Sequence, residues 1–239
     1  LMDKNELYRD IARRTNGEIY IGVVGPVRTG KSTFIKRFMD VMVIPGIQDE
    51  NVRARLTDEL PQSAAGRTIM TTQPRFIPNE AATLEIENMQ VKIRMADCVG
   101  YMVEGAVGHI ENNAPRMVRT PWFDYDIPFE DAAEIGTNKV ITEHSTIGIM
   151  VTTDGSITDI KRPAYVDAEE RVIAELKNTG RPFIVIVNST DPCGAEATEL
   201  AAALAEKYGV IAMPANAMTM EQAQFEELLS SMLMAFPIR

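Results

Sequence analysis

One eight-residue segment has the spacing of a phosphate-binding loop. Residues 25–32 read Gly-Pro-Val-Arg-Thr-Gly-Lys-Ser, which matches the P-loop pattern G-x-x-x-x-G-K-[ST]. The two glycines let the backbone turn tightly, so that successive N–H groups face an anion. Lys31 is expected to contact the β- and γ-phosphates of a nucleotide, and the Ser32 hydroxyl to ligate Mg²⁺. The residues expected to contact nucleotide in this loop are Gly25, Arg28, Thr29, Gly30, Lys31, Ser32 and Thr33.

Besides the loop itself, a P-loop site needs a carboxylate to hold the metal ion, and Asp97 is placed to supply it. Asp97 ends a predicted strand and begins a D-x-x-G pattern that closes at Gly100. We expect Asp97 to hold Mg²⁺ through a water molecule, and the Gly100 amide to hydrogen-bond the γ-phosphate. Between the two motifs lie Thr71 and Thr72. Either threonine could close on Mg²⁺ and the γ-phosphate, and the sequence does not choose between them.

The signal for the nucleotide base is incomplete. In switch-type GTPases a strand ends in N-K-x-D, where the aspartate pairs with guanine. Here the corresponding residues are Asn188 and Asp191, but Ser189 replaces the lysine that packs over the base. Asp191 either reads a guanine edge or is a turn residue before Pro192. Tyr101 follows the D-x-x-G pattern, where many related enzymes have a water-orienting glutamine.

The elements expected around these motifs alternate between strand and helix. Such alternation is typical of an α/β fold of three layers, a mostly parallel twisted sheet with helices on both faces, as in P-loop NTPases. The predicted strands are 18–25, 75–77 running into 83–87, 91–97, 146–153, 182–188 and 210–213. The predicted helices are 3–15, 31–43, 48–62, 131–143, 166–178, 195–208 and 220–236.

Length and charge restrict the class of protein. The 239 residues suit a single domain, 1–239, with a helical extension at 1–17 and a long insertion or switch loop at 101–130. Because the chain ends directly after a predicted helix, we expect it to be one domain of a longer protein. The net charge is 24 − 34 = −10, which disfavours nucleic acid as a partner. Two cysteines and two histidines form no zinc pattern, and no apolar run reaches membrane-spanning length, so a cytoplasmic protein is expected.

Several runs together resemble the stage IV sporulation protein A family, the spore-coat morphogenetic ATPases of endospore-forming Firmicutes. They are EIYIGVVGPVRTGKSTFIKRFM, DELPQSAAGRTIMTTQPRFIPN, MADCVGY, TPWFDYDIPFEDAAEIGT and ITEHSTIGIMVTTDGSI. The resemblance implies the N-terminal ATPase domain, with a translation-factor-like topology and with ATP and Mg²⁺ as cofactors. It places the catalytic roles on Lys31, Asp97, Thr71 and Thr72, and the metal ligands at Ser32, Thr72 and Asp97.

The same resemblance implies a biological role. Family members hydrolyse ATP to drive self-assembly into filaments that form the basement layer of the spore coat, at the outer forespore surface in the mother-cell cytoplasm. The implied partners are other copies of the protein and, through regions outside this chain, a short amphipathic membrane-anchoring peptide and spore-coat proteins. Two alternatives remain open. One is a regulatory GTPase that binds a partner without polymerising, and the other is a structural subunit that holds nucleotide without turning it over.

Overall fold

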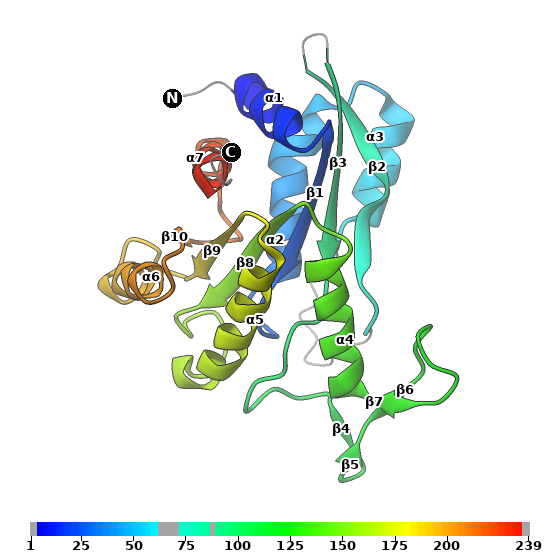
Figure 1. Cartoon of the computed structure of the whole chain (residues 1–239), viewed down its shortest axis with the longest axis vertical. Helices are drawn as coiled ribbons and strands as arrows, with labels where there is room; N and C mark the ends of the chain where they lie inside the picture. The colour runs from blue at the N-terminus through cyan, green and yellow to red at the C-terminus, as the bar shows by residue number, and fades with distance from the viewer. Residues whose placement is uncertain (1–3, 62–71, 87–88, 236–239) are drawn as a thin grey trace.

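A mostly parallel six-stranded sheet forms the centre of the molecule (Figure 1). The computed structural model describes residues 4–61, 72–86 and 89–235. The strand order is β10-β9-β8-β1-β3-β2, and each neighbouring pair is parallel except β2 with β3. The strands of this sheet are β1 (Glu18–Val24), β2 (Arg75–Ile86), β3 (Met89–Asp97), β8 (Ile147–Thr153), β9 (Phe183–Asn188) and β10 (Ala212–Ala215).

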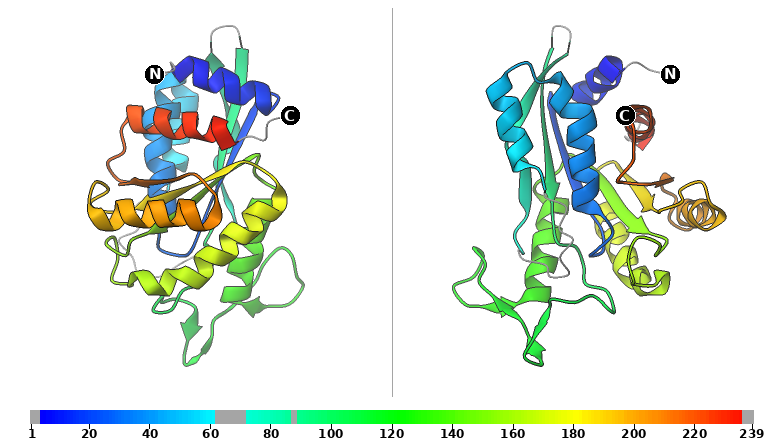
Figure 2. Two further views of the ribbon diagram at one scale, coloured as in Figure 1. Left: turned by 60° about the vertical axis from the view of Figure 1, so that its left-hand side comes forward. Right: turned by 180° about the vertical axis from the view of Figure 1, so that it is seen from behind.

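Helices cover both faces of this sheet, so the three layers expected from the sequence are present (Figure 2). The first face carries α1, α2, α3 and α7, with Phe34 and Phe225 in its core. The second carries α4, α5 and α6, with Tyr165 and Val172 buried against the strands. In the described chain the α-helices are α1 (Lys4–Arg14), α2 (Lys31–Phe38), α3 (Glu50–Glu59), α4 (Phe129–Thr142), α5 (Val166–Thr179), α6 (Ala195–Tyr208) and α7 (Gln222–Ala235).

Three of the differences from the predicted element boundaries change how an element is described. The helix expected over 31–43 is α-helical only to Phe38 and continues as a π-helical turn, Met39–Val43, and a 3₁₀ turn, Ile44–Gly46. The last strand begins at Ala212 rather than at Val210, because the Val210 amide still bonds to Ala205 in the cap of α6. The strand expected at 75–77 running into 83–87 is β2, which also includes the residues between these two ranges and has an irregular register between Ile77 and Ala82.

The N-terminal helix is part of the core. Ile11 and Ala12 of α1 are 0% and 1% exposed, and they belong to the same apolar cluster as β1 and α2. α1 also lies against α7, which brings the two ends of the described chain together (Figure 1). The apolar side of α1, in the segment expected to be a helical extension, therefore contributes to the folded body. Among the described residues, no helix is both long enough and apolar enough to cross a membrane.

The long segment between β3 and α4 projects from the body of the molecule. Residues 101–128, called here the 101–128 segment, contain four two-residue strands: β4 (Ile110–Glu111), β5 (Ala114–Pro115), β6 (Met117–Val118) and β7 (Ile127–Pro128). They pair as β4–β5 and β6–β7 and lie beyond the lower end of the sheet in Figure 1. The segment carries several exposed large apolar side chains, namely Val107, Ile110, Met117 and Tyr125.

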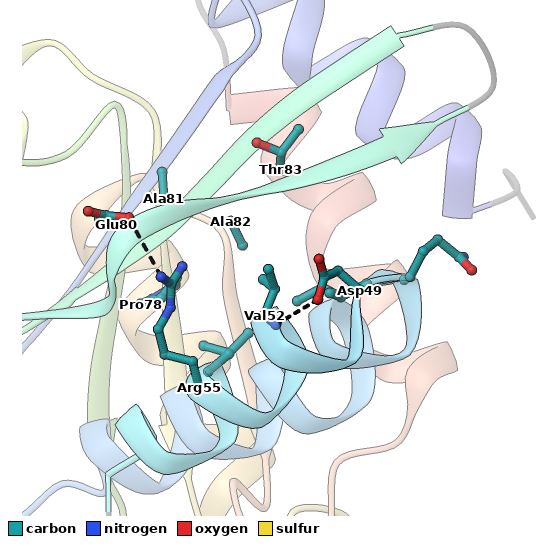
Figure 3. Close-up of a pocket in the computed structure, with 12 residues that line it drawn as sticks. Asp49, Val52, Arg55, Pro78, Glu80, Ala81, Ala82 and Thr83 are labelled. Atoms are coloured by element: carbon teal, nitrogen blue, oxygen red, sulfur yellow. Dashed lines mark hydrogen bonds and ion pairs between the residues drawn. The ribbon is translucent and has the colours of Figure 1, made fainter.

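A cavity of about 330 Å³ lies between α3 and β2 (Figure 3). Its rim includes the Arg55–Glu80 ion pair, with 3.8 Å between charged atoms, and Asp49, which caps α3 by accepting the Val52 amide. Its lining includes Gly46, at the end of the helical run that begins at Lys31. The cavity is therefore at the opposite end of that run from the predicted phosphate-binding loop and forms no part of it.

Candidate nucleotide-binding site

The predicted phosphate-binding loop connects β1, in the middle of the sheet, to α2. Two of its residues must be glycine. Gly25 has φ +142°, and a Cβ there would lie 2.2 Å from the main-chain oxygen of Val151. Gly30 has φ +92°, and a Cβ there would lie 2.3 Å from Nδ2 of Asn188. The loop backbone thus packs closely against the carboxyl ends of β8 and β9, as the glycine spacing indicates.

The Lys31 side chain is folded into the loop. It is 5% exposed, and its Nζ donates a 2.6 Å hydrogen bond to the main-chain oxygen of Pro26. The Thr29 hydroxyl donates to the same oxygen at 3.0 Å. Burial lowers the pKa of Lys31, while the neighbouring Cys98 and Asp97 oppose that shift. A buried ammonium with one short bond can exchange its carbonyl partner for a phosphate oxygen, which compensates its charge far better.

Asp97 and Ser32 meet at the mouth of the loop. Asp97 ends β3 beside Val23 of β1, and its Oδ2 accepts a 2.6 Å hydrogen bond from the Ser32 hydroxyl. Its other oxygen, Oδ1, is buried and accepts no hydrogen bond from the described residues. Burial raises the pKa of Asp97, whereas the Ser32 hydroxyl, the charges of Lys31 and Arg75, and the nearby Cys98 amide lower it.

This pair of oxygen ligands fits Mg²⁺. Magnesium takes oxygen ligands and usually combines one or two carboxylates with phosphate oxygens and water. The orphaned Oδ1 and the neighbouring hydroxyl supply such a partial set. Within the described ranges, no group of three or more His, Cys, Asp or Glu side chains could hold a metal ion. The remaining ligands at Asp97 would therefore come from the nucleotide and from water.

Gly100 lies directly against the loop. Its φ is +95°, and a Cβ there would lie 2.2 Å from the Gly25 oxygen and 2.8 Å from Lys31 Nζ. Its amide, however, donates to the hydroxyl of Thr137 on α4 at 3.2 Å. The expected bond from this amide to a γ-phosphate stays a prediction, and it requires the amide to leave Thr137.

Of the two candidate threonines, the structure describes Thr72. Thr71 lies outside the described residues, whereas Thr72 is buried, with 6% of its surface exposed. The main-chain oxygen of Thr72 packs against α4, where a Cβ at Gly136 would approach it to 2.7 Å. The roles predicted for Thr71 and Thr72 stay predictions.

Asn188 braces the loop. It is 5% exposed, and its Nδ2 donates to the main-chain oxygen of Thr29 at 3.0 Å. Its Oδ1 accepts the amide of Ala217 at 3.0 Å. Ser189 is buried and accepts the Asp191 amide through its hydroxyl, so it does not extend over a base. Asp191 is exposed at the same edge, and its role in base selection stays a prediction.

Tyr101 points away from the loop. Its hydroxyl donates to the Glu175 carboxylate at 2.6 Å, and the Arg171 guanidinium lies 4.3 Å from its ring centroid. Burial raises the pKa of Tyr101, and the hydrogen bond to Glu175 adds to the shift, so the side chain remains a neutral phenol. Its main chain contacts the loop, where the Tyr101 oxygen accepts the Val27 amide at 2.9 Å. The side chain thus joins the start of the 101–128 segment to α5.

The structure brings most predicted site residues to one edge of the sheet. Arg28 adopts a left-handed backbone conformation, with φ +59°, and Thr33 is half-buried in the first turn of α2. Sequence reasoning missed two neighbours of the site, Gly136 and Thr137, which contact the Thr72 oxygen and the Gly100 amide. No motif marks them, since a threonine within a helix after an irregular segment has no distinctive pattern.

Comparison with known proteins identifies the family. The family model described as "Stage IV sporulation protein A, ATPase domain" matches residues 2–237. The chain belongs to the stage IV sporulation protein A ATPase-domain family. It is 52% identical to the stage IV sporulation protein A of Bacillus anthracis over 238 residues, and the same holds for the protein of Bacillus subtilis (strain 168). The Clostridioides difficile (strain 630) protein is 52% identical over 235 residues.

The matches cover nearly the whole chain but only part of each relative. They span 98–99% of this chain and 48% of the relatives, so the chain spans about half the length of the stage IV sporulation proteins A that it matches. The family expected from the sequence runs is confirmed, and with it the class of a sporulation protein with an ATPase domain.

Proposed function

We propose that this chain binds ATP with Mg²⁺ at the loop Gly25–Ser32 and hydrolyses it. The observation that carries the proposal is the buried Oδ1 of Asp97, which has no partner among the described residues, beside the Ser32–Asp97 hydrogen bond. A buried acceptor without a partner costs free energy, and a bound ligand that fills it removes that cost. Mg²⁺, when bound, would neutralise charge on the β- and γ-phosphate oxygens.

The chain's own residues would then exchange partners. Lys31 Nζ leaves the Pro26 oxygen for the phosphates, and the Ser32 hydroxyl leaves Asp97 for the metal. Both exchanges replace a bond inside the protein with one to a more highly charged partner. The central position of β1, with β2 antiparallel at one edge, supports a translation-factor-like topology for this P-loop NTPase.

The base is proposed to be adenine. Ser189 is buried where a guanine-binding protein has a lysine over the base, and both polar atoms of the Asn188 side chain are bonded to main chain. The description of the family as an ATPase domain supports the same choice. A GTPase that regulates a partner is the second candidate, and the exposed carboxylate of Asp191 beside this edge favours it.

We further propose that the nucleotide cycle drives self-assembly into the basement layer of the spore coat. The support is the membership of a sporulation family, together with the apolar surface of the 101–128 segment, which begins directly after Gly100. The proposed place is the mother-cell cytoplasm at the outer forespore surface. Contacts with a membrane-anchoring peptide and with coat proteins are assigned to regions outside this chain.

Nucleotide competition and phosphate release test the enzymatic part. Calorimetry of the chain with Mg²⁺ should give tighter binding of ATP than of GTP, and no binding to Lys31→Ala. Asp97→Ala and Thr72→Ala should still bind ATP but release little phosphate. A preference for GTP that Asp191→Ala abolishes would establish the regulatory GTPase instead. Phosphate release by the unmodified chain at the rate of Lys31→Ala would mean that nucleotide is only a static cofactor.

A further inference from the structure

The Gly100 amide donates to a hydroxyl whose own proton is already used in another hydrogen bond. Thr137 is 0% exposed, and its hydroxyl donates its own proton to the Ala133 oxygen at 2.8 Å. Because a hydroxyl has one proton, its oxygen is left to accept the Gly100 N–H at 3.2 Å. The sulfur of Cys98 is also close to this amide, and burial raises the pKa of that thiol to about 11. A thiol sulfur is a weak acceptor, so Thr137 supplies the main bond.

The same glycine lies where the end of a triphosphate would be. A Cβ at Gly100 would come within 2.8 Å of Lys31 Nζ, the group proposed to meet the β- and γ-phosphates. At φ +95° a glycine can rotate its peptide without the steric penalty of other residues. The amide can therefore turn from α4 toward a phosphate oxygen beside Lys31.

Gly136, the residue before Thr137, lies against Thr72, which is one of the two threonines predicted to contact the γ-phosphate. A Cβ at Gly136 would lie 2.7 Å from the Thr72 oxygen and 3.4 Å from the ring of Trp122, in the 101–128 segment. Figure 1 shows α4 between the sheet and this projecting segment. Two consecutive helix positions thus face Gly100, Thr72 and the 101–128 segment.

We propose that the Thr137 hydroxyl competes with the γ-phosphate for the Gly100 amide and so sets the preference of the site for triphosphate over diphosphate. This inference rests on the proposed function. With a diphosphate the amide keeps its bond to Thr137. With a triphosphate it exchanges a neutral acceptor for a charged one, and charge-assisted hydrogen bonds are about twice as strong as neutral ones. Thr137 is a positioning residue, since it acts through Gly100.

Substitution at Thr137 separates this role from a purely structural one. Thr137→Val keeps the shape of the side chain but removes the acceptor, so the buried amide lacks its main partner in every state except the triphosphate complex. We expect the ratio of dissociation constants, MgADP over a non-hydrolysable Mg-ATP analogue, to increase about five- to thirtyfold by calorimetry. Thr137→Ser retains the hydroxyl and should keep the ratio within about twofold. A structural role alone would weaken both affinities equally.

The outcomes distinguish this inference from the function on which it rests. If the unmodified chain binds both nucleotides and Thr137→Val leaves the ratio unchanged, the inference is wrong and the proposed function stands. If the unmodified chain binds neither nucleotide, both are wrong. Should Thr137→Val fail to fold, the NMR shift of the Gly100 amide in the unmodified chain decides. We expect that shift to change with the ATP analogue and not with ADP, and an identical shift in the two complexes overturns the inference.

Discussion

Replacement of Asn188 should lower both the free energy of unfolding and the affinity for ATP, because Asn188 holds the phosphate-binding loop in place. In Asn188→Ala the Thr29 oxygen and the Ala217 amide each lose a 3.0 Å partner, and both residues are 0% exposed. A buried main-chain group left without a partner costs about 1–3 kcal/mol, so we expect the free energy of unfolding to fall by about 2–4 kcal/mol. The affinity for ATP should fall as well, because the loop backbone is no longer held for the phosphates.

Asp191→Ala is the matched control, because Asp191 is exposed and follows the same strand. Urea unfolding followed by circular dichroism should place its free energy of unfolding within about 0.5 kcal/mol of the unmodified chain. If adenine is the base, its affinity for ATP should also be unchanged. A loss of less than about 0.5 kcal/mol in Asn188→Ala, equal to that in Asp191→Ala, would refute the assignment of Asn188 as a brace.

Three further substitutions test separate parts of the site. Gly25→Ala should cost about 3 kcal/mol or more in urea unfolding, because its Cβ meets backbone, whereas Gly180→Ala, with φ +65° and nothing within 4 Å of the new Cβ, should cost about 1–2 kcal/mol. Equal losses would contradict the close packing of the loop. Tyr101→Phe should lower the free energy of unfolding by about 1–2 kcal/mol through the lost bond to Glu175, with ATP affinity unchanged in calorimetry. A large drop in ATP affinity would place the Tyr101 hydroxyl in the site. Asp97→Asn should raise the melting temperature of the nucleotide-free chain at pH 7. Because burial raises the pKa of Asp97 above its ordinary value of 3.8, the cost of ionising it is absent below that pH and complete above the raised pKa. The gain in melting temperature should therefore shrink as the pH falls toward 4, and a gain independent of pH would contradict the assignment.

Local patterns predicted the alternation of strands and helices and the tight turns of the loop at residues 25–32. The loop Gly25–Ser32 needs glycines at fixed positions between a strand and a helix, and those requirements are visible in eight consecutive residues. The apolar run of β9 likewise indicates a strand that is covered on both faces, and all its residues except Phe183 are buried. Such features depend on neighbours in sequence, which is why they are readable without a structure.

Contacts between distant residues were not predictable in this way. Asn188 bonds to Thr29, 159 residues away, and its pattern pointed to base recognition rather than to a brace. Thr137 meets Gly100 across 37 residues of mostly irregular chain. The direction of the Tyr101 side chain depends on Glu175, which lies on α5, 74 residues further along the chain. Each of these contacts follows from tertiary packing, which no spacing rule describes.

A crystal structure of this chain with a non-hydrolysable ATP analogue and Mg²⁺ tests the central claim most directly. The account predicts the phosphates within the turn of Gly25–Ser32, Lys31 Nζ moved from the Pro26 oxygen to the phosphates, and Mg²⁺ bound by the Ser32 hydroxyl with Asp97 Oδ1 facing the ion or its water. An analogue bound elsewhere, or a complex in which Ser32 keeps its hydrogen bond to Asp97 and Oδ1 remains without a partner, would contradict it.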